Sequence, residues 1–257
     1  MYSNEHNMVH IDMTQPLLTQ ISKFNKYSYL NWVHNPYTVP YERFGMTQAR
    51  IFKSNFMERL SYTNWYVIPL VWIPVVVYFW SFYLKSIYDE RDIISLVKCV
   101  TLLQTGLVLW SLIEYSVHRF LFHIDEKLPN YNWILKLHFL LHGIHHKVPN
   151  DPYRLVMPPA LMSVLVFIGY NFFKKLILFW IPDDMFRAIL GSVIFGYVMY
   201  DMMHYSEHHL KSSDKSYFGK LRRYHMKHHF MTKGHHQGFG ITTKFWDYIF
   251  NTLLRIE

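Results

Sequence analysis

The sequence predicts an all-α membrane protein with four transmembrane helices in two hairpins and a cytosolic helical cap that holds a histidine-rich di-metal site. Three observations lead to this prediction. Hydrophobic residues form 51% of the chain and gather in long runs. Charged residues form only 17%, against about 25% in a typical soluble domain. Four short clusters of histidine lie beside the ends of the apolar runs.

Two apolar runs form the first predicted hairpin. The run 60–84 carries no charge over 25 residues, which exceeds the roughly 20 that a helix needs to cross a bilayer. Pro69 and Pro74 should kink this helix, which membrane helices tolerate. The second run, 93–117, follows after a short polar connection.

Two further runs form the second predicted hairpin. The run 155–173 is uncharged over 19 residues, and the run 185–203 is the weakest of the four. Gly191 and Gly196 in the fourth run form a possible small-residue packing face. The alternative that one or two of the four runs are buried or re-entrant helices stays open.

An even number of spans places three polar segments, 1–59, 118–154 and 204–257, on one side of the membrane. Twenty of the 26 Lys and Arg residues lie in these segments, and such an excess marks the cytosolic side. We therefore expect an interfacial N-terminal segment over 1–59 and one domain over 60–257. The net charge of +8 fits an anionic membrane surface better than nucleic acid in a chain with such apolar runs.

The histidine clusters have the spacing of metal ligands. They contain ten of the 17 histidines, namely His118, His123, His142, His145, His146, His204, His208, His225, His228 and His229. Residues three and four apart share a face of a helix, so three of the clusters can each present their imidazoles together. The pair His118 and His123 is five apart and needs a helix end or a local distortion. Neutral imidazole suits zinc, iron and copper, and ten imidazoles fit two ions at about five ligands each.

Other readings of the histidines are weaker. A single cluster is often only a basic, solvated surface, but four clusters on one side of a membrane bundle are not explained in that way. The absence of any CxxC pair excludes a structural zinc–thiolate site. We leave four other histidines outside the metal set: His138, His209, His235 and His236.

Three polar residues near the clusters are further candidates. Asp201 precedes His204 by three residues and can either fix the tautomer of that histidine or bind a polar substrate headgroup. Tyr200 and Asp201, where the fourth run meets the clusters, are the candidates for orienting the polar end of a substrate. Glu114 is equally compatible with orienting a ligand and with a structural ion pair.

The histidine clusters lie within longer stretches that resemble the fatty acid hydroxylase superfamily of membrane di-metal enzymes, and most closely its fatty acid 2-hydroxylases. The matching stretches are EYSVHRFLFH (114–123), HFLLHGIHHKVPNDPYRLVMPP (138–159), GYVMYDMMHYSEHH (196–209), YHMKHHF (224–230) and GFGIT (238–242). The block at 138–159 is highly specific, whereas generic histidine boxes identify only the superfamily. The resemblance covers nearly the whole chain after about Ile11.

The resemblance implies that the ten clustered histidines bind two metal ions, with iron active and zinc able to occupy the same positions. It also implies O2-dependent hydroxylation at C2 of the acyl chain of ceramide or a fatty acid, in the endoplasmic reticulum membrane with the site facing the cytosol. The segment 34–36, His-Asn-Pro, does not match the HPGG segment of the cytochrome b5 domain that many members carry. We therefore expect electrons from a separate cytochrome b5 and its reductase.

The chemistry agrees with a redox metal pair, because side-chain acids and bases cannot activate the C–H bonds of an acyl chain alone. Three alternatives remain. One is another oxygenase of the superfamily, such as a sterol methyl oxidase or a desaturase. Another is a non-enzymatic membrane metal carrier, whose ligands should lie near the bilayer midplane. The last is a structural zinc protein. The predicted partners are the lipid bilayer and a ceramide or fatty acyl substrate.

Overall fold

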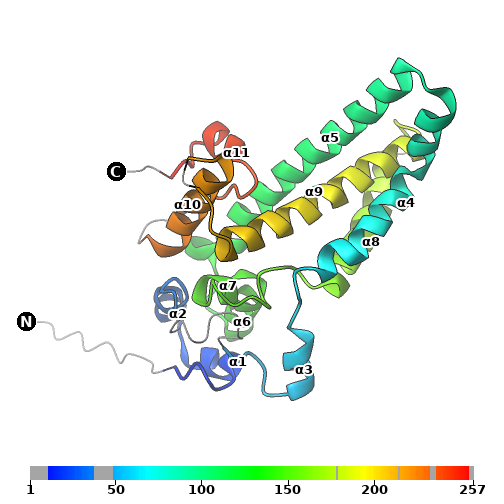
Figure 1. Cartoon of the computed structure of the whole chain (residues 1–257). Helices are drawn as coiled ribbons and strands as arrows, with labels where there is room; N and C mark the ends of the chain where they lie inside the picture. The colour runs from blue at the N-terminus through cyan, green and yellow to red at the C-terminus, as the bar shows by residue number, and fades with distance from the viewer. Residues whose placement is uncertain (1–10, 38–48, 178, 214, 232–235, 255–257) are drawn as a thin grey trace, which may run out of the picture.

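The computed structural model describes residues 11–37, 49–177, 179–213, 215–231 and 236–254. These residues form helices and connecting loops and contain no strand, which confirms the all-α prediction for the described part. Long helices form a bundle that extends away from a cap of short helices (Figure 1).

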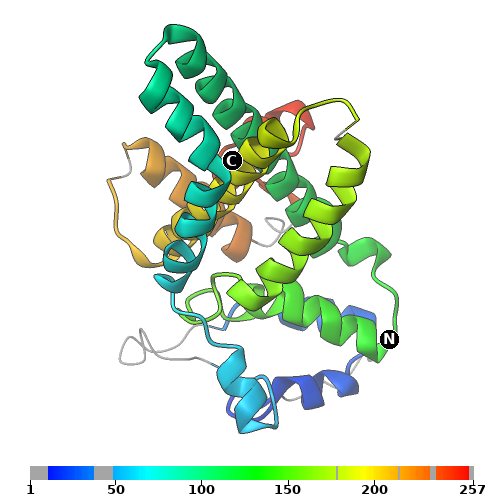
Figure 2. The same ribbon diagram turned by 90° about the vertical axis from the view of Figure 1, so that its right-hand side faces the viewer.

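The bundle contains four helices: α4 (Val67–Glu90), α5 (Ile93–Val117), α8 (Pro159–Ile177) and α9 (Asp183–His209). Helices α4 and α5 form a hairpin, and α9 packs along both of them. Asp92 caps α5, because its carboxylate accepts a hydrogen bond from the backbone N–H of Ser95 at 2.6 Å. Helix α8 runs along the edge of the bundle, where it contacts α4 and α9 (Figure 2).

Three stretches of described helix are long and apolar enough to cross a membrane: Val67–Asp89, Ile93–Phe122 and Asp183–His209. Helix α8 overlaps the third predicted span but begins and ends four residues later. It has 19 residues with Lys174 and Lys175 in its last turn, and it does not belong to this group. The structure therefore agrees with a multi-pass membrane protein, and the count of four spans stays a prediction.

The first membrane helix begins later than the sequence predicts. Residues 60–66 are uncharged, yet the short helix α3 (Asn55–Leu60) ends there, and the backbone N–H of Thr63 bonds to the carbonyl of Tyr153 at 2.9 Å. Helix α3 also crosses the boundary that we expected after residue 59. Pro69 falls in the first turn of α4, where its missing N–H is not needed, so only Pro74 interrupts the helix interior.

Two glycines of α9 let the bundle helices approach each other closely, as predicted. Each of the two glycines faces a different helix. A Cβ added to Gly196 would lie 2.6 Å from the Cβ of Trp110 in α5. A Cβ added to Gly191 would lie 2.9 Å from the ring of Trp80 in α4. Any larger side chain at either position would force α9 away from its partner.

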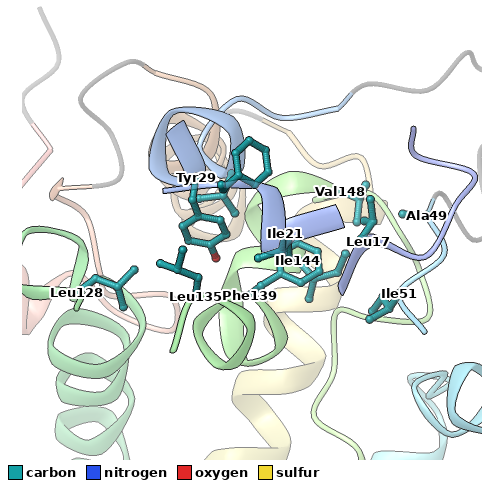
Figure 3. Close-up of a cluster of buried hydrophobic side chains, with 12 residues drawn as sticks. Leu17, Ile21, Tyr29, Ala49, Ile51, Leu128, Leu135, Phe139, Ile144 and Val148 are labelled. Carbon is teal, nitrogen blue, oxygen red and sulfur yellow. The ribbon is translucent and has the colours of Figure 1, made fainter. Parts of the chain in front are cut away.

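The cap packs an N-terminal pair of helices against the segment that carries the second histidine cluster. Its elements are α1 (Leu17–Gln20), η1 (Ile21–Lys23), α2 (Lys26–Val33), η4 (Asp125–Lys127), α6 (Asn132–His138), η5 (Phe139–Gly143) and α7 (Ile144–Lys147). A cluster of buried apolar side chains joins these elements, including Leu17, Ile21, Tyr29, Leu135, Phe139 and Ile144 (Figure 3). Burial of this apolar surface stabilises the cap and fixes α7 in place.

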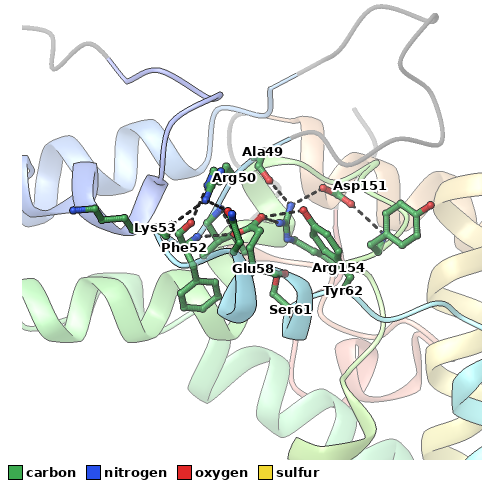
Figure 4. Close-up of polar contacts among 12 residues, drawn as sticks. Ala49, Arg50, Phe52, Lys53, Glu58, Ser61, Tyr62, Asp151 and Arg154 are labelled. Atoms are coloured by element: carbon green, nitrogen blue, oxygen red, sulfur yellow. Dashed lines mark hydrogen bonds and ion pairs between the residues drawn. The ribbon is translucent and has the colours of Figure 1, made fainter.

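Two polar contacts reinforce the cap. The Nζ of Lys147 donates to the carbonyls of Trp32 and Asn35 at 3.1 and 2.6 Å, which ties the end of α2 to α7. On the other side, the carboxylate of Glu58 accepts hydrogen bonds from Arg154 and from the backbone of Ile51 and Phe52 (Figure 4). Of the remaining elements, α10 (Tyr217–Phe230) packs against α9, whereas η3 (His118–Phe122) and α11 (Phe245–Ile249) contact α5.

Candidate metal centre

The ten clustered histidines come together as two groups of five buried side chains. In each group, one ring nitrogen from every residue lies within 4.8 Å of the others, so each group could hold a metal ion. The first group contains His118, His123, His142, His146 and His228, and the second contains His145, His204, His208, His225 and His229. The division into five and five is the one that the number of imidazoles predicted.

Two π-helical turns shape the first group. The backbone N–H of His123 bonds to the carbonyl of His118 at 3.1 Å, five residues back, in the turn η3. This wide turn brings the two rings to a centroid distance of 4.9 Å, as the spacing of five required. The second π-turn, η5, ends just after His142 and leads directly into α7.

Two of the four sequence clusters are divided between the groups, although residues three and four apart were expected to present their imidazoles together. His142 and His146, four apart, join the first group, whereas His145 between them joins the second. In α10, His225 and His229 join the second group and His228 joins the first. Residues four apart nearly eclipse each other on a helix, and the intervening residue faces sideways. Each of these two helical segments therefore serves both groups.

The distances between ring nitrogens fit ligands that share one ion. Metal–imidazole bonds of about 2.0–2.1 Å place two neighbouring ligand atoms about 3 Å apart. In the second group, the Nε2 of His204 lies 2.9 Å from that of His145. The Nε2 of His225 lies 2.9 and 3.0 Å from those of His208 and His229. In the first group, the Nε2 of His123 lies 3.1 Å from that of His146.

Backbone carbonyls orient two members of the first group. The Nδ1 of His118 lies 2.6 Å from the carbonyl of Phe239, and the Nδ1 of His228 lies 2.7 Å from the carbonyl of Gln237. An Nδ1–H that donates to a carbonyl leaves the Nε2 lone pair free, which is the tautomer that a metal ligand needs. The loop at 237–242 is thus part of the site.

Two buried carboxylates hold this loop. Glu114 accepts hydrogen bonds from the backbone of Ile241 and Thr242, both at 2.8 Å. Among the described residues it has no contact with a candidate ligand and no ion pair, so it supports the site through the loop. Asp247 in α11 accepts from the backbone N–H groups of Phe239 and Gly240 at 3.0 and 2.9 Å.

Asp247→Asn should weaken metal binding at the first group by about 10–100-fold, because it disturbs the loop that carries two orienting carbonyls. The second group, which does not bond to this loop in the described residues, should keep its affinity. Competition titrations of metal-free protein with a coloured chelator would measure both affinities. Asp92→Asn, at the far end of α5, is the matched control. An equal loss of metal affinity in both groups would contradict the role of Asp247 in holding the loop.

Burial keeps the candidate ligands neutral. For six of the members outside the apolar spans, burial first and then the neighbouring imidazoles lower the pKa well below its usual value. These are His123, His142, His145, His146, His225 and His229. Neutral imidazole is the form that binds a cation, so the electrostatics favour a metal site.

The lowered pKa values predict that the metal-free protein loses stability in acid. Its folded state binds fewer protons than the unfolded state below about pH 6.5, the ordinary histidine pKa, so its unfolding free energy falls as the pH falls. Each such histidine contributes up to about 1.4 kcal/mol per pH unit. Thermal melts of metal-free protein should move downward between pH 7 and pH 5, and a constant melting temperature over that range would refute the prediction.

The structure places the two substrate-orienting candidates at the edge of the second group. The ring of Tyr200 stacks on His204 at a centroid distance of 5.7 Å. Asp201 is buried, and its carboxylate accepts from the backbone N–H of Met157 at 3.2 Å. Among the contacts of the described residues, Asp201 has no bond to His204, so the role of fixing that tautomer is not supported.

The histidines left outside the set lie beside the groups or away from them. Both ring nitrogens of His138 are engaged, with the hydroxyl of Tyr29 and the carbonyl of Phe122, each at 2.8 Å. His209 packs on Tyr205 and belongs to neither group. His236 also belongs to neither, and His235 lies outside the described residues.

Sequence reasoning missed Asp125. Its carboxylate lies 2.9 Å from the Nε2 of His34, 3.6 Å from that of His138 and 4.0 Å from the Nδ1 of His123. It therefore supplies negative charge behind the first group. The only signal for it was an acidic residue two positions after His123.

Comparisons with known proteins agree with this geometry. A family model described as fatty acid hydroxylase matches residues 103–252, a range that contains all ten histidines. The chain belongs to the fatty acid hydroxylase family. It is 41% identical to "Ceramide very long chain fatty acid hydroxylase SCS7" of Saccharomyces cerevisiae, over 98% of this chain and 61% of that protein.

Two further relatives and one solved structure are also similar to this chain. Human "Fatty acid 2-hydroxylase" is 38% identical over 95% of this chain and 64% of its own length. "Dihydroceramide fatty acyl 2-hydroxylase FAH2" of Arabidopsis thaliana is 39% identical over 96% of this chain and 94% of its own length. This fatty acid hydroxylase chain thus spans less than two thirds of the yeast and human relatives. A solved structure titled "Full length scs7p (only hydroxylase domain visible)" matches with a TM-score of 0.81 and 40% identity, over 99% of this chain and 90% of that one.

Proposed function

We propose that this chain is an O2-dependent hydroxylase that acts at C2 of the acyl chain of a ceramide or fatty acid and makes 2-hydroxy sphingolipids. The observation that carries the proposal is the pair of buried five-histidine groups at the end of a bundle of apolar helices. The printed names of the yeast, human and plant relatives support the choice of reaction and substrate.

The ten histidines would hold two metal ions, iron in the active enzyme, although the same donors suit zinc. Bound iron would supply the redox chemistry needed to hydroxylate an unactivated C–H bond with O2. The protein buries all ten imidazoles, and burial favours the neutral form that binds a metal in six of them outside the apolar spans. Electrons would come from a separate cytochrome b5 and its reductase.

The surrounding residues would position the substrate. Tyr200 and Asp201 would orient the polar end of the lipid beside the second group, and the acyl chain would run among the apolar helices, so that regiochemistry follows from position. The groups lie where α9 and η3 end rather than midway along the spans, which disfavours a membrane metal carrier. We place the enzyme in the endoplasmic reticulum membrane, with the groups on the cytosolic side.

Mass spectrometry of ceramides from cells with and without the protein tests the proposal. The expected result is a rise in 2-hydroxy acyl ceramides that disappears in His145→Ala. Altered sterols without 2-hydroxy ceramides would replace the proposal with a sterol oxygenase. Bound metal without an O2-dependent product, even with iron and cytochrome b5 supplied, would favour a structural zinc protein.

A further inference from the structure

The short helix α11 has an outward face that is unusually apolar for the end of a basic, polar segment. Phe245, Tyr248 and Ile249 on this face are 53%, 71% and 52% exposed. No described element of the chain covers these side chains. Such a face needs an occupant, because clustered exposed aromatic side chains are disfavoured in water.

The inner face of α11 fixes its level along the bundle. The Nε1 of Trp246 donates to the hydroxyl of Ser111 in α5 at 3.0 Å, and the ring of Phe250 stacks on Tyr115 of α5 at 5.3 Å. Ser111 and Tyr115 belong to the stretch Ile93–Phe122, which is apolar and long enough to span a membrane. Ser111 lies about 17 Å before the end of that stretch, at 1.5 Å per residue. The outward side chains therefore stand beside a membrane-level part of α5.

Cations accompany the apolar face. Lys244 immediately precedes α11, and its Nζ lies 4.2 Å from the ring centre of Tyr224. Burial lowers the pKa of Lys244, and the nearby charges of Arg223 and Lys220 lower it further. Aromatic residues flanked by Lys and Arg are typical of segments that lie in the headgroup region of a bilayer.

We infer that α11 lies in the plane of the membrane interface, with Phe245, Tyr248 and Ile249 among the lipids of the leaflet on the side of the cap. The occupant of the face is thus a lipid surface. This inference depends on insertion of the chain in a membrane and is independent of the reaction that it catalyses.

The location couples the bilayer to the metal site. The same five-residue helix carries Asp247, which holds the loop whose carbonyls orient His118 and His228. Lipid contact on one face of α11 would therefore stabilise the position of the loop at 237–242, which lies on the other face. A detergent that does not cover the apolar face of α11 should therefore weaken metal binding at the first histidine group before it affects the second.

Spin labels can test the position of α11 directly. The chain has one cysteine, Cys99, which is buried, so Cys99→Ser gives a background for single labelling sites. Nitroxide would be attached to Tyr248→Cys in vesicles of phosphatidylcholine and phosphatidylserine. Tyr27→Cys, 80% exposed on α2 of the cap, is the matched tyrosine control, and Val108→Cys, 58% exposed on α5, is the lipid-facing control.

Collisions with dissolved O2 and with a water-soluble nickel chelate report the surroundings of each label. The Tyr248 label should resemble the Val108 label, with an O2-to-nickel collision ratio several-fold above that of Tyr27. A ratio equal to that of Tyr27 would place α11 in water and overturn the inference. A label shielded from both reagents would mean a protein contact and overturn it as well. Ile249→Cys repeats the measurement if Tyr248→Cys does not fold.

Discussion

Alanine at His142 and at His145 should remove different metal ions, although the two residues are only three apart in the sequence. His142 belongs to the first group of five and His145 to the second. Each variant should therefore bind one ion, where we expect two in the unmodified chain. Hydroxylation should fall by more than about 100-fold in both, because loss of a ligand should exceed the 10–100-fold cost of disturbing a group behind one.

Metal analysis of the purified variants measures the stoichiometry, and spectroscopy of cobalt-substituted protein identifies the surviving group. His209→Ala is the matched control, since His209 is adjacent to His208 but belongs to neither group. It should retain two ions and most of the activity. Loss of both ions in His142→Ala, or retention of both, would contradict the assignment of the two groups.

Spacing alone was enough to select the ten residues that the structure brings together. It could not assign them to groups, because the assignment depends on how η5, α7 and α10 are rotated against the end of α9. His142 and His146 separate from His145 only once the facing helices are in place. The carbonyls of Gln237 and Phe239 were also invisible in the sequence, since any residue supplies a backbone carbonyl.

The apolar pattern predicted the position of two bundle helices, one of them from the run 185–203 that is the weakest of the four. Helices α5 and α9 lie over the predicted runs, although α9 continues through His208 and so delivers two histidines from one rigid element. The beginning of α4 was not predictable from charge alone. Uncharged residues around Thr63 bond to the loop at Tyr153 instead of extending the helix. A tertiary contact therefore sets that boundary.

Arg154 is the centre of a buried polar network that joins the N-terminal segment to the loop after α7. Its guanidinium donates to Glu58, to Asp151 at 2.8 Å and to the carbonyl of Ala49 at 2.6 Å (Figure 4). Glu58 in turn accepts from the backbone N–H of Phe52 at 2.7 Å. The side chains of Arg154 and Glu58 are only 3% and 9% exposed, so neither charge is solvated by water if the other is removed.

Arg154→Met should destabilise the protein by about 3–5 kcal/mol, because it leaves two buried carboxylates without their cation. At about 2–4 °C per kcal/mol for a chain of this size, the melting temperature should fall by roughly 6–20 °C. Lys53→Met, an exposed position in the same segment, is the matched control and should change it little.

The double variant Glu58→Leu with Arg154→Met separates the charge effect from the loss of packing. In Arg154→Met, the carboxylate of Glu58 stays buried without its cation. The double variant removes that unpaired charge and should therefore be more stable than Arg154→Met alone. The double variant should still be less stable than the unmodified chain. Glu58 also accepts hydrogen bonds from the backbone N–H groups of Ile51 and Phe52, which would lose their acceptor. A double variant that is less stable than Arg154→Met would mean that the acceptor role of Glu58 outweighs its charge pairing.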